Sequence, residues 1–428
     1  MIRLDTAAPG FAAAFDALVN DRREADADVS RDVAAIIGSV RREGDAAIHA
    51  FTKKFDGHDL NESGWRIERA DCDAALATLD SDLRVALKLA RDRIAAYHEK
   101  QRPADAEYAE ANGIVTGARW RGVDAAGLYV PGGRAAYPSS VLMNAIPARV
   151  AGVERLVIVT PTPNGEVNPL VLAAAALVGA DEVWRVGGAQ AVAALAYGTD
   201  RIKAVDVICG PGNAWVAEAK RQLFGVVGID MVAGPSEIVV VADGANDPEW
   251  TAADLLSQSE HDPTSQSILF TDDAGFADAV ADAVDRQIGT LSTAKVARAA
   301  WDANGAIVLV PSLAEAMPLV NRLAPEHLEL AVADPAPLFD LVRHAGSVFL
   351  GRHTPEAVGD YVAGPNHVLP TGRRARFASG LSVIDFMKRT SFLSLSQEGL
   401  AAIGPAAVRL AEAEGLPAHA RSVALRLP

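Results

Sequence analysis

Cysteine is scarce in this sequence: Cys72 and Cys209 are the only two among 428 residues. Two cysteines exclude a disulfide framework and a zinc site built from several thiolates. This scarcity is typical of proteins that work in a reducing compartment.

The sequence also lacks an excess of positive charge, a long apolar run and a visible export signal. Its 55 acidic residues outnumber the 40 basic ones, and the net charge is -15, which argues against nucleic acid or an anionic membrane as the main partner. The most apolar run, "LVLAAAALVGA" at 170–180, is far shorter than the ~20 residues that span a bilayer. The first residues show no basic region followed by an apolar core. We therefore expect a cytoplasmic protein.

Half of the residues are hydrophobic, which is enough for more than one buried core. After a charged, helical region that ends near residue 120, short apolar strands alternate with alanine-rich helices. This alternation predicts a parallel sheet covered by helices on both faces. A second set follows, so we predict an α/β fold of two tandem doubly wound, Rossmann-like units with helical segments at both ends. The expected order is an N-terminal helical segment (1–25), a helical lead-in that packs with the second α/β unit (26–125), the first α/β unit (126–237), the second α/β unit (238–384) and a C-terminal helical arm (385–428).

Three strand-to-helix connections are rich in glycine and proline: "LYVPGGRAAYPSS" (128–140), "VGGAQAV" (186–192) and "CGPGNAWV" (209–216). Ligands of open α/β sheets bind at the carboxyl ends of the strands, where such loops let backbone N–H groups approach an anion. Each loop alone is a weak signal, because steric needs also produce glycine-rich turns. None is a complete G-x-G-x-x-G motif, since Trp215 stands in the place of the third glycine.

Side chains that suit a metal or proton transfer lie near helix ends, strand starts and broken loops. They are Gln258 and His261 in "LLSQSEHD", Glu326 and His327 in "APEHLEL", Asp360 and His367 in "GDYVAGPNHVLPT", and His419 in "GLPAHARS". Taken singly, each also fits a surface residue or a satisfied core residue. Neighbouring side chains on a strand point to opposite faces unless the backbone is irregular.

Eight segments, in this order, carry a family resemblance: "VPGGRAAYPSSVLMNAIPA", "VGGAQAVAALAYGT", "GPGNAWV", "AGPSEI", "LLSQSEHD", "APEHLEL", "GPNHVLPT" and "SGLSVIDFMKRTS". Together they closely resemble histidinol dehydrogenase, the zinc enzyme that ends histidine biosynthesis. The likeness runs from about residue 25 to the C-terminus.

The resemblance implies one Zn²⁺ per subunit held by Gln258, His261, Asp360 and His419. Two imidazoles and a carboxylate are ordinary zinc ligands, and the helical spacing of Gln258 and His261 aims both at one point. A carboxamide oxygen is a weak ligand that leaves the metal more Lewis acidic. In the family the amine and imidazole of the substrate bind the zinc directly, so the metal acts chiefly as a template.

The resemblance also implies the reaction, which is oxidation of L-histidinol through L-histidinal to L-histidine with two NAD⁺ and one water. A hydride leaves the carbinol carbon only as its hydroxyl loses a proton, so a base is needed. The resemblance assigns that base to His327 and the activation of the hydrating water to Glu326.

Substrate and cofactor contacts follow from the same resemblance. It implies that Ser236 and Glu414 bind the substrate together with His327 and the zinc ligands, and that NAD⁺ contacts Tyr129, Gln190 and Asn213, one in each glycine-rich loop. Without the resemblance, Tyr129 would be interpreted as a core tyrosine, Gln190 as an amide at the start of a helix and Asn213 as an asparagine in a turn.

The family is a homodimer in which the C-terminal arm crosses to the partner. The resemblance therefore implies shared active sites, with His419 and Glu414 coming from the other chain. An arm folded back on its own chain is the alternative that the sequence leaves open.

Two other functions compete with this interpretation. A paralogue would oxidise a different amino or polyol alcohol on the same scaffold, although no transferred position departs from the histidinol pattern. A non-catalytic metal carrier would also use paired lobes and a histidine-rich cleft. Cys209 invites a thiohemiacetal mechanism, but no base or helix N-terminus precedes it to lower its pKa.

Overall fold

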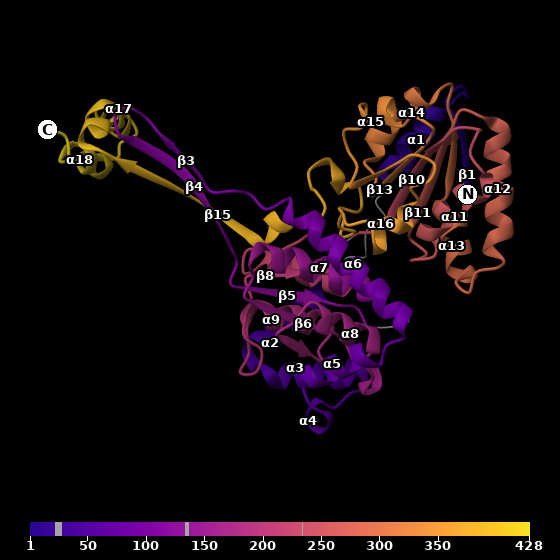
Figure 1. The fold of residues 1–428 in the computed structure, drawn as a ribbon, viewed down its shortest axis with the longest axis horizontal. Coiled ribbons are helices and arrows are strands. Elements are labelled where there is room, and N and C mark those ends of the chain that lie inside the picture. The colour runs from indigo at the N-terminus through magenta and orange to yellow at the C-terminus, as the bar shows by residue number, and fades with distance from the viewer. Residues whose placement is uncertain (22–27, 133–136, 233) are drawn as a thin grey trace.

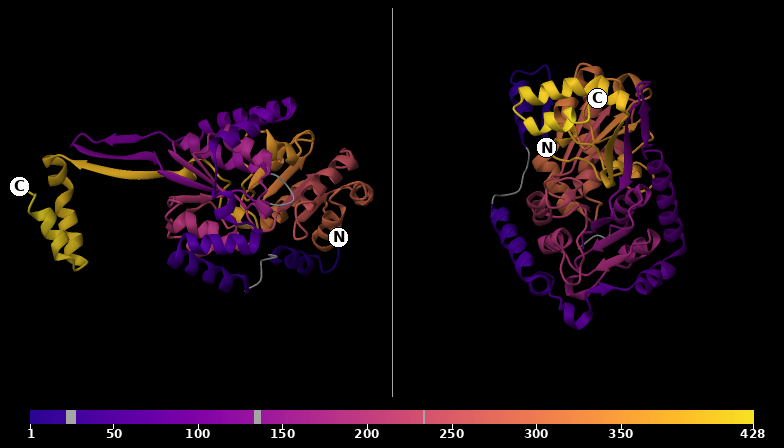
Figure 2. Two further views of the ribbon diagram at one scale, coloured as in Figure 1. Left: turned by 90° about the horizontal axis from the view of Figure 1, so that it is seen from below. Right: turned by 90° about the vertical axis from the view of Figure 1, so that its left-hand side faces the viewer.

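The computed structural model describes residues 1–21, 28–132, 137–232 and 234–428. It shows two α/β units and a long arm that projects away from both (Figure 1). Each unit is built on a six-stranded sheet. The C-terminus lies at the tip of the arm, at the opposite end of the molecule from the N-terminus (Figure 2). Among the helices of the described ranges, none is long and apolar enough to cross a membrane.

The first sheet has the strand order β2-β7-β6-β5-β8-β9. All its pairings are parallel except that of β2, which runs antiparallel to β7. Its strands are β2 (Arg66–Ile67), β5 (Ala125–Tyr129), β6 (Arg155–Val159), β7 (Glu182–Trp184), β8 (Val207–Cys209) and β9 (Gly228–Ile229).

Helices cover both faces of this sheet, as the alternating pattern predicts. One face packs against α5 (Arg69–Thr78), α6 (Ser81–Glu99), α7 (Pro138–Ala151) and α8 (Pro169–Leu177). The other packs against α2 (Asp28–Glu43), α3 (Asp45–Asp56), α9 (Gly188–Tyr197) and α10 (Ala214–Leu223). The short α4 (Leu60–Ser63) and η1 (Pro163–Gly165) lie in connections.

The second sheet is entirely parallel, with the order β1-β12-β11-β10-β13-β14. Its strands are β1 (Ile2–Asp5), β10 (Glu237–Ala242), β11 (Gln266–Thr271), β12 (Ala306–Leu309), β13 (His327–Ala331) and β14 (Ser347–Leu350). One face packs against α11 (Pro248–Ser259), α12 (Ala274–Ile288) and α13 (Ala294–Asn304). The other packs against α1 (Phe11–Asn20) and α14 (Leu313–Leu323), with α15 (Ala336–Phe339) and α16 (Glu356–Tyr361) after β13 and β14. Two doubly wound units are thereby confirmed.

The arm is a three-stranded antiparallel ribbon that ends in a helical hairpin. Its strand order is β15-β4-β3, with β3 (Ala106–Ala109), β4 (Ile114–Gly122) and β15 (Met387–Leu395). The hairpin consists of α17 (Gln397–Ala413) and α18 (Pro417–Ala424). Two short helices, η2 (Arg374–Arg376) and η3 (Val383–Phe386), precede β15, and Phe386 is buried in the core of the first unit.

The helical segments expected at both ends are present as α1, α17 and α18, but the structure differs from the sequence-based expectation in three details. Residues 1–25 begin with a strand, because β1 pairs with β12 at the edge of the second sheet. The helices described within the lead-in at 26–125 pack on the first sheet instead of the second unit, since the apolar stripes of α2, α5 and α6 lie in the two cores of the first unit. Its strands β3 and β4 belong to the arm. The tail contains β15, which gives no strand signal because most of its side chains are exposed on both faces of the ribbon.

Candidate active site

The adjacent pair Glu326 and His327 is buried at the start of β13, next to the start of β10. The backbone N–H of Glu237 donates to Oε2 of Glu326 at 3.0 Å, and Nδ1 of His327 lies 3.1 Å from the carbonyl oxygen of Glu237. Since a carbonyl only accepts, Nδ1 carries the proton and Nε2 keeps its lone pair. One backbone residue thus orients both side chains. They lie together because Glu326 precedes the strand, where the alternation of faces does not apply.

A buried ion pair anchors Glu237 in turn. Nη1 of Arg373 lies 3.0 Å from Oε1 of Glu237, and both side chains are almost fully buried. Nη2 of Arg373 also donates to Oε1 of Gln266 on the neighbouring strand at 2.6 Å. The start of β10 is therefore fixed by more than its ladder of backbone hydrogen bonds.

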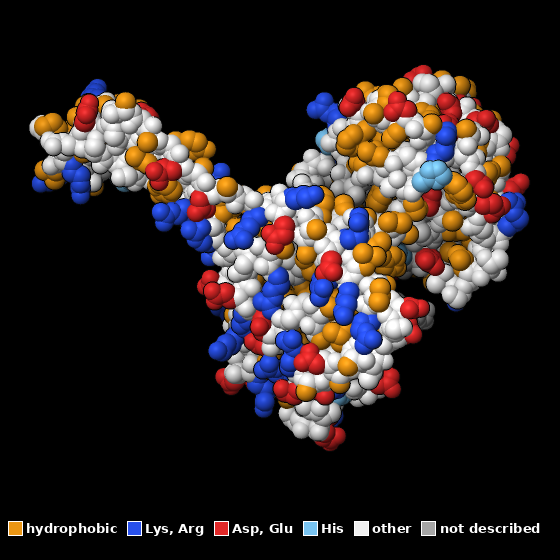
Figure 3. All heavy atoms as spheres, in the orientation of Figure 1, with side chains coloured by type: hydrophobic (Ala, Val, Ile, Leu, Met, Phe, Trp, Pro, Cys, Tyr) orange, Lys and Arg blue, Asp and Glu red, His pale blue; other side chains and the backbone are white. Residues whose placement is uncertain are grey.

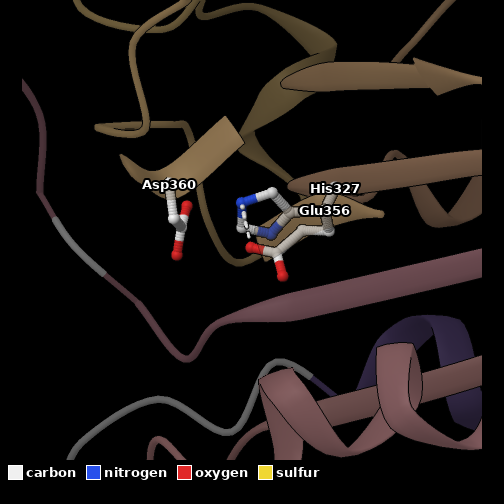
Figure 4. Close-up of side chains that lie close together, drawn as sticks. All are labelled: His327, Glu356 and Asp360. Atoms are coloured by element: carbon white, nitrogen blue, oxygen red, sulfur yellow. Dashed lines mark ion pairs between the residues drawn. The ribbon is translucent and has the colours of Figure 1, made fainter. Parts of the chain in front are cut away.

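Two carboxylates from α16 face His327. Glu356 and Asp360 are one helical turn apart, and Oε1 of Glu356 lies 3.5 Å from Nε2 of His327. The hydroxyl of Ser257 on α11 donates to the other oxygen of Glu356 at 3.0 Å. Ligand atoms of the three residues lie within 4.8 Å of one another, and Figure 4 shows the three side chains gathered around one space.

Burial controls the protonation of this group. It raises the pKa of Asp360 to about 8, with repulsion from Glu356 as the second cause, and it raises the pKa of Glu326 well above its usual range. Burial also lowers the pKa of His327 to about 4, so its imidazole is neutral at pH 7. Several carboxyl groups held out of water beside neutral imidazoles favour a bound cation.

The helix end that holds Gln258 and His261 packs beside α16. Nε2 of Gln258 lies 3.1 Å from Nδ1 of His261, so the two side chains meet as their spacing predicts. Gln258 is fully buried, and its Oε1 has no hydrogen-bond partner among the described residues. His261 lies close enough to His327 to lower its pKa by charge repulsion. A buried acceptor oxygen normally has a partner, and a bound cation would be a suitable partner for this one.

His367 joins the same cleft. Its Nδ1 lies 3.7 Å from Oδ1 of Asp360, and burial lowers its pKa to about 4. The adjacent Asn366 donates to the carbonyl oxygen of Met143 on α7 at 2.6 Å. The loop that carries His367 therefore connects the cleft to the first unit.

The structure does not bring His419 and Glu414 to this cleft within one chain. Both are exposed on the helical hairpin of the arm, which extends away from the two units (Figure 1). Ser236 by contrast directly precedes Glu237, and its carbonyl accepts from the backbone N–H of Gln266 at 3.0 Å. It thus lies at the same edge of the sheet as the catalytic pair.

This edge corrects an expectation from the sequence. We expected the chemistry at the carboxyl ends of the strands, but Ser236, Glu326 and His327 lie at the amino ends of β10 and β13. The side chains of Gln258 and Asp360 reach that edge because α11 and α16 run back toward it. The described parts of the glycine-rich loops of the first unit do lie at the carboxyl edge of their sheet.

Those loops place the three candidate NAD⁺ contacts at the ends of β5, β7 and β8. Tyr129 is buried, its hydroxyl accepts from the backbone N–H of Gly188 at 3.0 Å, and burial raises its pKa to about 12. Gln190 is buried in the first turn of α9. Asn213 caps α10, where its side chain accepts from the N–H groups of Trp215 and Val216. Two helix N-termini beside the central strand of the sheet form a suitable anion site.

The nearby Cys209 is a poor nucleophile. It is fully buried, and burial raises the pKa of its thiol well above the usual range. A thiol that stays protonated does not support a thiohemiacetal mechanism.

Sequence reasoning missed Glu356 and gave His367 no role. The spacing of Glu356 and Asp360 by four residues puts both on one helix face, and this signal was available in "PEAVGDY". Nothing in the sequence places this face beside His327, because that contact depends on how α16 packs against β13.

Comparisons with known proteins agree with this geometry. The family model for histidinol dehydrogenase matches residues 19–427. A histidinol dehydrogenase of Zymomonas mobilis is 65% identical over 427 residues, covering 100% of this chain and 99% of that protein, and one of Rhodospirillum rubrum is 60% identical, covering 100% and 98%. A crystal structure of histidinol dehydrogenase from Elizabethkingia anophelis superimposes with a TM-score of 0.94 at 35% identity, covering 100% of this chain and 98% of that one.

Full-length identity and superposition of this extent leave no part of the chain unmatched. The buried pair Glu326 and His327 and the adjacent acidic cleft lie within the matched region. The chain therefore belongs to the histidinol dehydrogenase family.

Proposed function

We propose that this protein oxidises L-histidinol to L-histidine through L-histidinal, using two NAD⁺ and a bound zinc ion, in the last step of histidine biosynthesis. The observation that carries the proposal is the buried pair Glu326 and His327, both oriented by the backbone of Glu237 and facing the carboxylates of α16. The full-length relatives are histidinol dehydrogenases, and the pair supplies the two proton transfers that such a reaction needs.

The residues of the cleft fit a zinc ion. Gln258, His261 and Asp360 would hold it from one chain, with His419 as a further ligand. The buried, unpartnered Oε1 of Gln258 and the raised pKa of Asp360 both support a cation here. Zinc would supply Lewis acidity and a fixed point on which the amine and imidazole of histidinol are oriented. Glu356 and His367 surround the same space and would hold the ligands in place.

His327 is suited to act as the base. Its Nδ1 is engaged by the carbonyl of Glu237, so Nε2 is the nitrogen that accepts a proton from the hydroxyl of the substrate. The lowered pKa keeps Nε2 unprotonated at neutral pH. Glu326 is the group that would activate a water in the second oxidation. Burial raises its pKa well above the usual range, so it would act as a base once its own proton has left.

NAD⁺ would bind across the glycine-rich loops of the first unit. Tyr129 and Asn213 lie at the ends of two paired strands, β5 and β8, and Gln190 lies in the first turn of α9. The N-termini of α9 and α10 would face the pyrophosphate. Bound NAD⁺ supplies the hydride acceptor, and the chain supplies its orientation.

The arm supports a homodimer with shared sites. Figure 3 shows hydrophobic side chains on its visible surface, and its exposed apolar residues include Leu393, Ile403, Leu410, Leu416 and Leu425. An isolated hairpin with such a surface needs a partner to bury it. We propose that His419 and Glu414 complete the cleft of a second copy of this chain.

The function is tested by NADH formation with zinc and a panel of amino and polyol alcohols. Histidinol is expected to be the preferred substrate in kcat/KM by a wide margin, because its imidazole and amine can both bind in the cleft. A higher kcat/KM for another alcohol would indicate a paralogue. A zinc-loaded protein that oxidises none of them would contradict the proposal.

The two catalytic roles are separated by half-reaction kinetics. His327→Ala is expected to slow histidinol oxidation by about 10²-fold or more, as for other general bases. Glu326→Gln is expected to slow oxidation of supplied histidinal at least as much as that of histidinol. His353→Ala, which changes an exposed histidine whose ring lies beside that of Trp250 at a tilt of 58°, serves as a control with unchanged rates. Normal histidinal oxidation by Glu326→Gln would remove Glu326 from the water-activating role.

Shared sites are tested by mixing two inactive variants, His261→Ala and His419→Ala. After joint denaturation and refolding, each heterodimer regains one complete site, so random pairing restores about a quarter of wild-type activity. Each variant refolded alone is the control and stays inactive. No recovery in a mixture shown by mass to contain heterodimers would mean that each site is built from one chain.

A further inference from the structure

We infer that a buried ion pair between Lys220 and Asp230 positions the glycine-rich loop that binds NAD⁺. The two are positioning residues, because they act on the loop and not on the reacting atoms. This inference rests on the proposed function, since it takes Tyr129 and Asn213 as contacts of the cofactor.

The pair holds both polar groups of one loop residue. Lys220 points inward from α10, and its ammonium contacts the carboxylate of Asp230, with side chains only 2% and 1% exposed. Nζ of Lys220 donates to the carbonyl oxygen of Gly210 at 3.1 Å. Oδ2 of Asp230 accepts from the N–H of Gly210 at 2.8 Å. The cation therefore holds the C=O and the anion holds the N–H of Gly210.

Gly210, which is held by the ion pair, contacts the loops that carry the candidate cofactor contacts. Its φ is +111°, and a Cβ there would lie 2.1 Å from the carbonyl oxygen of Tyr129, so only glycine fits. The hydroxyl of Tyr129 accepts from the N–H of Gly188, which leads into the helix of Gln190. Asn213 lies three residues after Gly210 and begins the helix that carries Lys220. The ion pair thus fixes Gly210, and contacts through Tyr129 connect Gly210 to the other two loops.

The choice of residue types supports positioning over simple stability. Burying two charges is costly, and an apolar pair of similar volume often stabilises a fold as well or better. What the ion pair adds is a directional hold on a peptide group, through charge-assisted hydrogen bonds that an apolar pair does not make. Neither Lys220 nor Asp230 lies in the cleft of the second unit. We therefore expect the ion pair to affect NAD⁺ binding and not the binding of zinc or histidinol.

The test compares Lys220→Met, the charge-free double variant Lys220→Met/Asp230→Asn, and wild type. Arg221→Gln is the matched control, because it removes an exposed ion pair with Glu218 from the same helix. The readouts are the circular dichroism spectrum, zinc content, the KM values for NAD⁺ and histidinol, and NADH binding measured by its own fluorescence. Binding at equilibrium reports on the loop without requiring turnover.

Lys220→Met is expected to weaken NADH binding and raise the KM for NAD⁺ by about tenfold or more, as small misplacements of binding groups do. Zinc content and the KM for histidinol should stay at wild-type values, and Arg221→Gln should bind NADH normally. Lys220→Met leaves the carboxylate of Asp230 buried without its cation and could therefore fail to fold. In that case the double variant is the test. We expect it to fold and to show the same loss of NADH affinity.

Three results would overturn the inference: a folded variant with wild-type NADH affinity, a parallel loss of zinc, histidinol and NADH binding, or failure of both variants to fold. The last two would show that the pair serves the fold as a whole. The proposed function fails separately, if wild type binds NADH but does not oxidise histidinol. A wild-type protein that bound no NADH would overturn both.

Discussion

Desolvation of ionisable groups is the constraint on which the cleft depends. Glu326, Glu356 and Asp360 are carboxyl groups held out of water at one edge of the second sheet, and His327 and His367 are imidazoles that burial keeps neutral. Among the described residues, the ion pairs of His327 involve only the acids Glu326 and Glu356. Burial, followed by repulsion from Glu356, raises the pKa of Asp360 to about 8, so without a cation this carboxyl group holds a proton at pH 7. A divalent cation would remove this penalty, which supports the proposed metal site.

The two units present opposite edges of their sheets: the first unit presents carboxyl ends of strands and the second presents amino ends. The first unit presents the carboxyl ends of its strands, where helix N-termini and glycine-rich loops suit an anionic cofactor. The second presents the amino ends of β10 and β13, where the backbone of Glu237 orients the side chains of Glu326 and His327. The loop of Asn366 and His367 joins the two through its contact with α7. In the proposed reaction, the hydride acceptor would bind to the first unit and the proton acceptors would lie on the second.

The sequence predicted what depends on local spacing. The alternation of apolar strands and alanine-rich helices predicted both doubly wound units, and the one-turn separation of Gln258 and His261 predicted that their side chains meet. Packing between distant segments was not predictable in this way. The contact of Glu356 with His327, the packing of the lead-in on the first sheet and the exposed strand β15 each depend on tertiary arrangement. The proposed role of His419 requires a second chain, so neither the sequence pattern nor the geometry of one chain tests it.

Proton release on zinc binding tests the central claim that these buried acids await a cation. Calorimetric titration of Zn²⁺ into metal-free protein near pH 7, in two buffers with different ionisation enthalpies, counts the protons released. With the pKa of Asp360 raised to about 8, its proton must leave when it binds the metal, so we expect about one proton or more per zinc. Tight, stoichiometric zinc binding with no proton release would contradict the account.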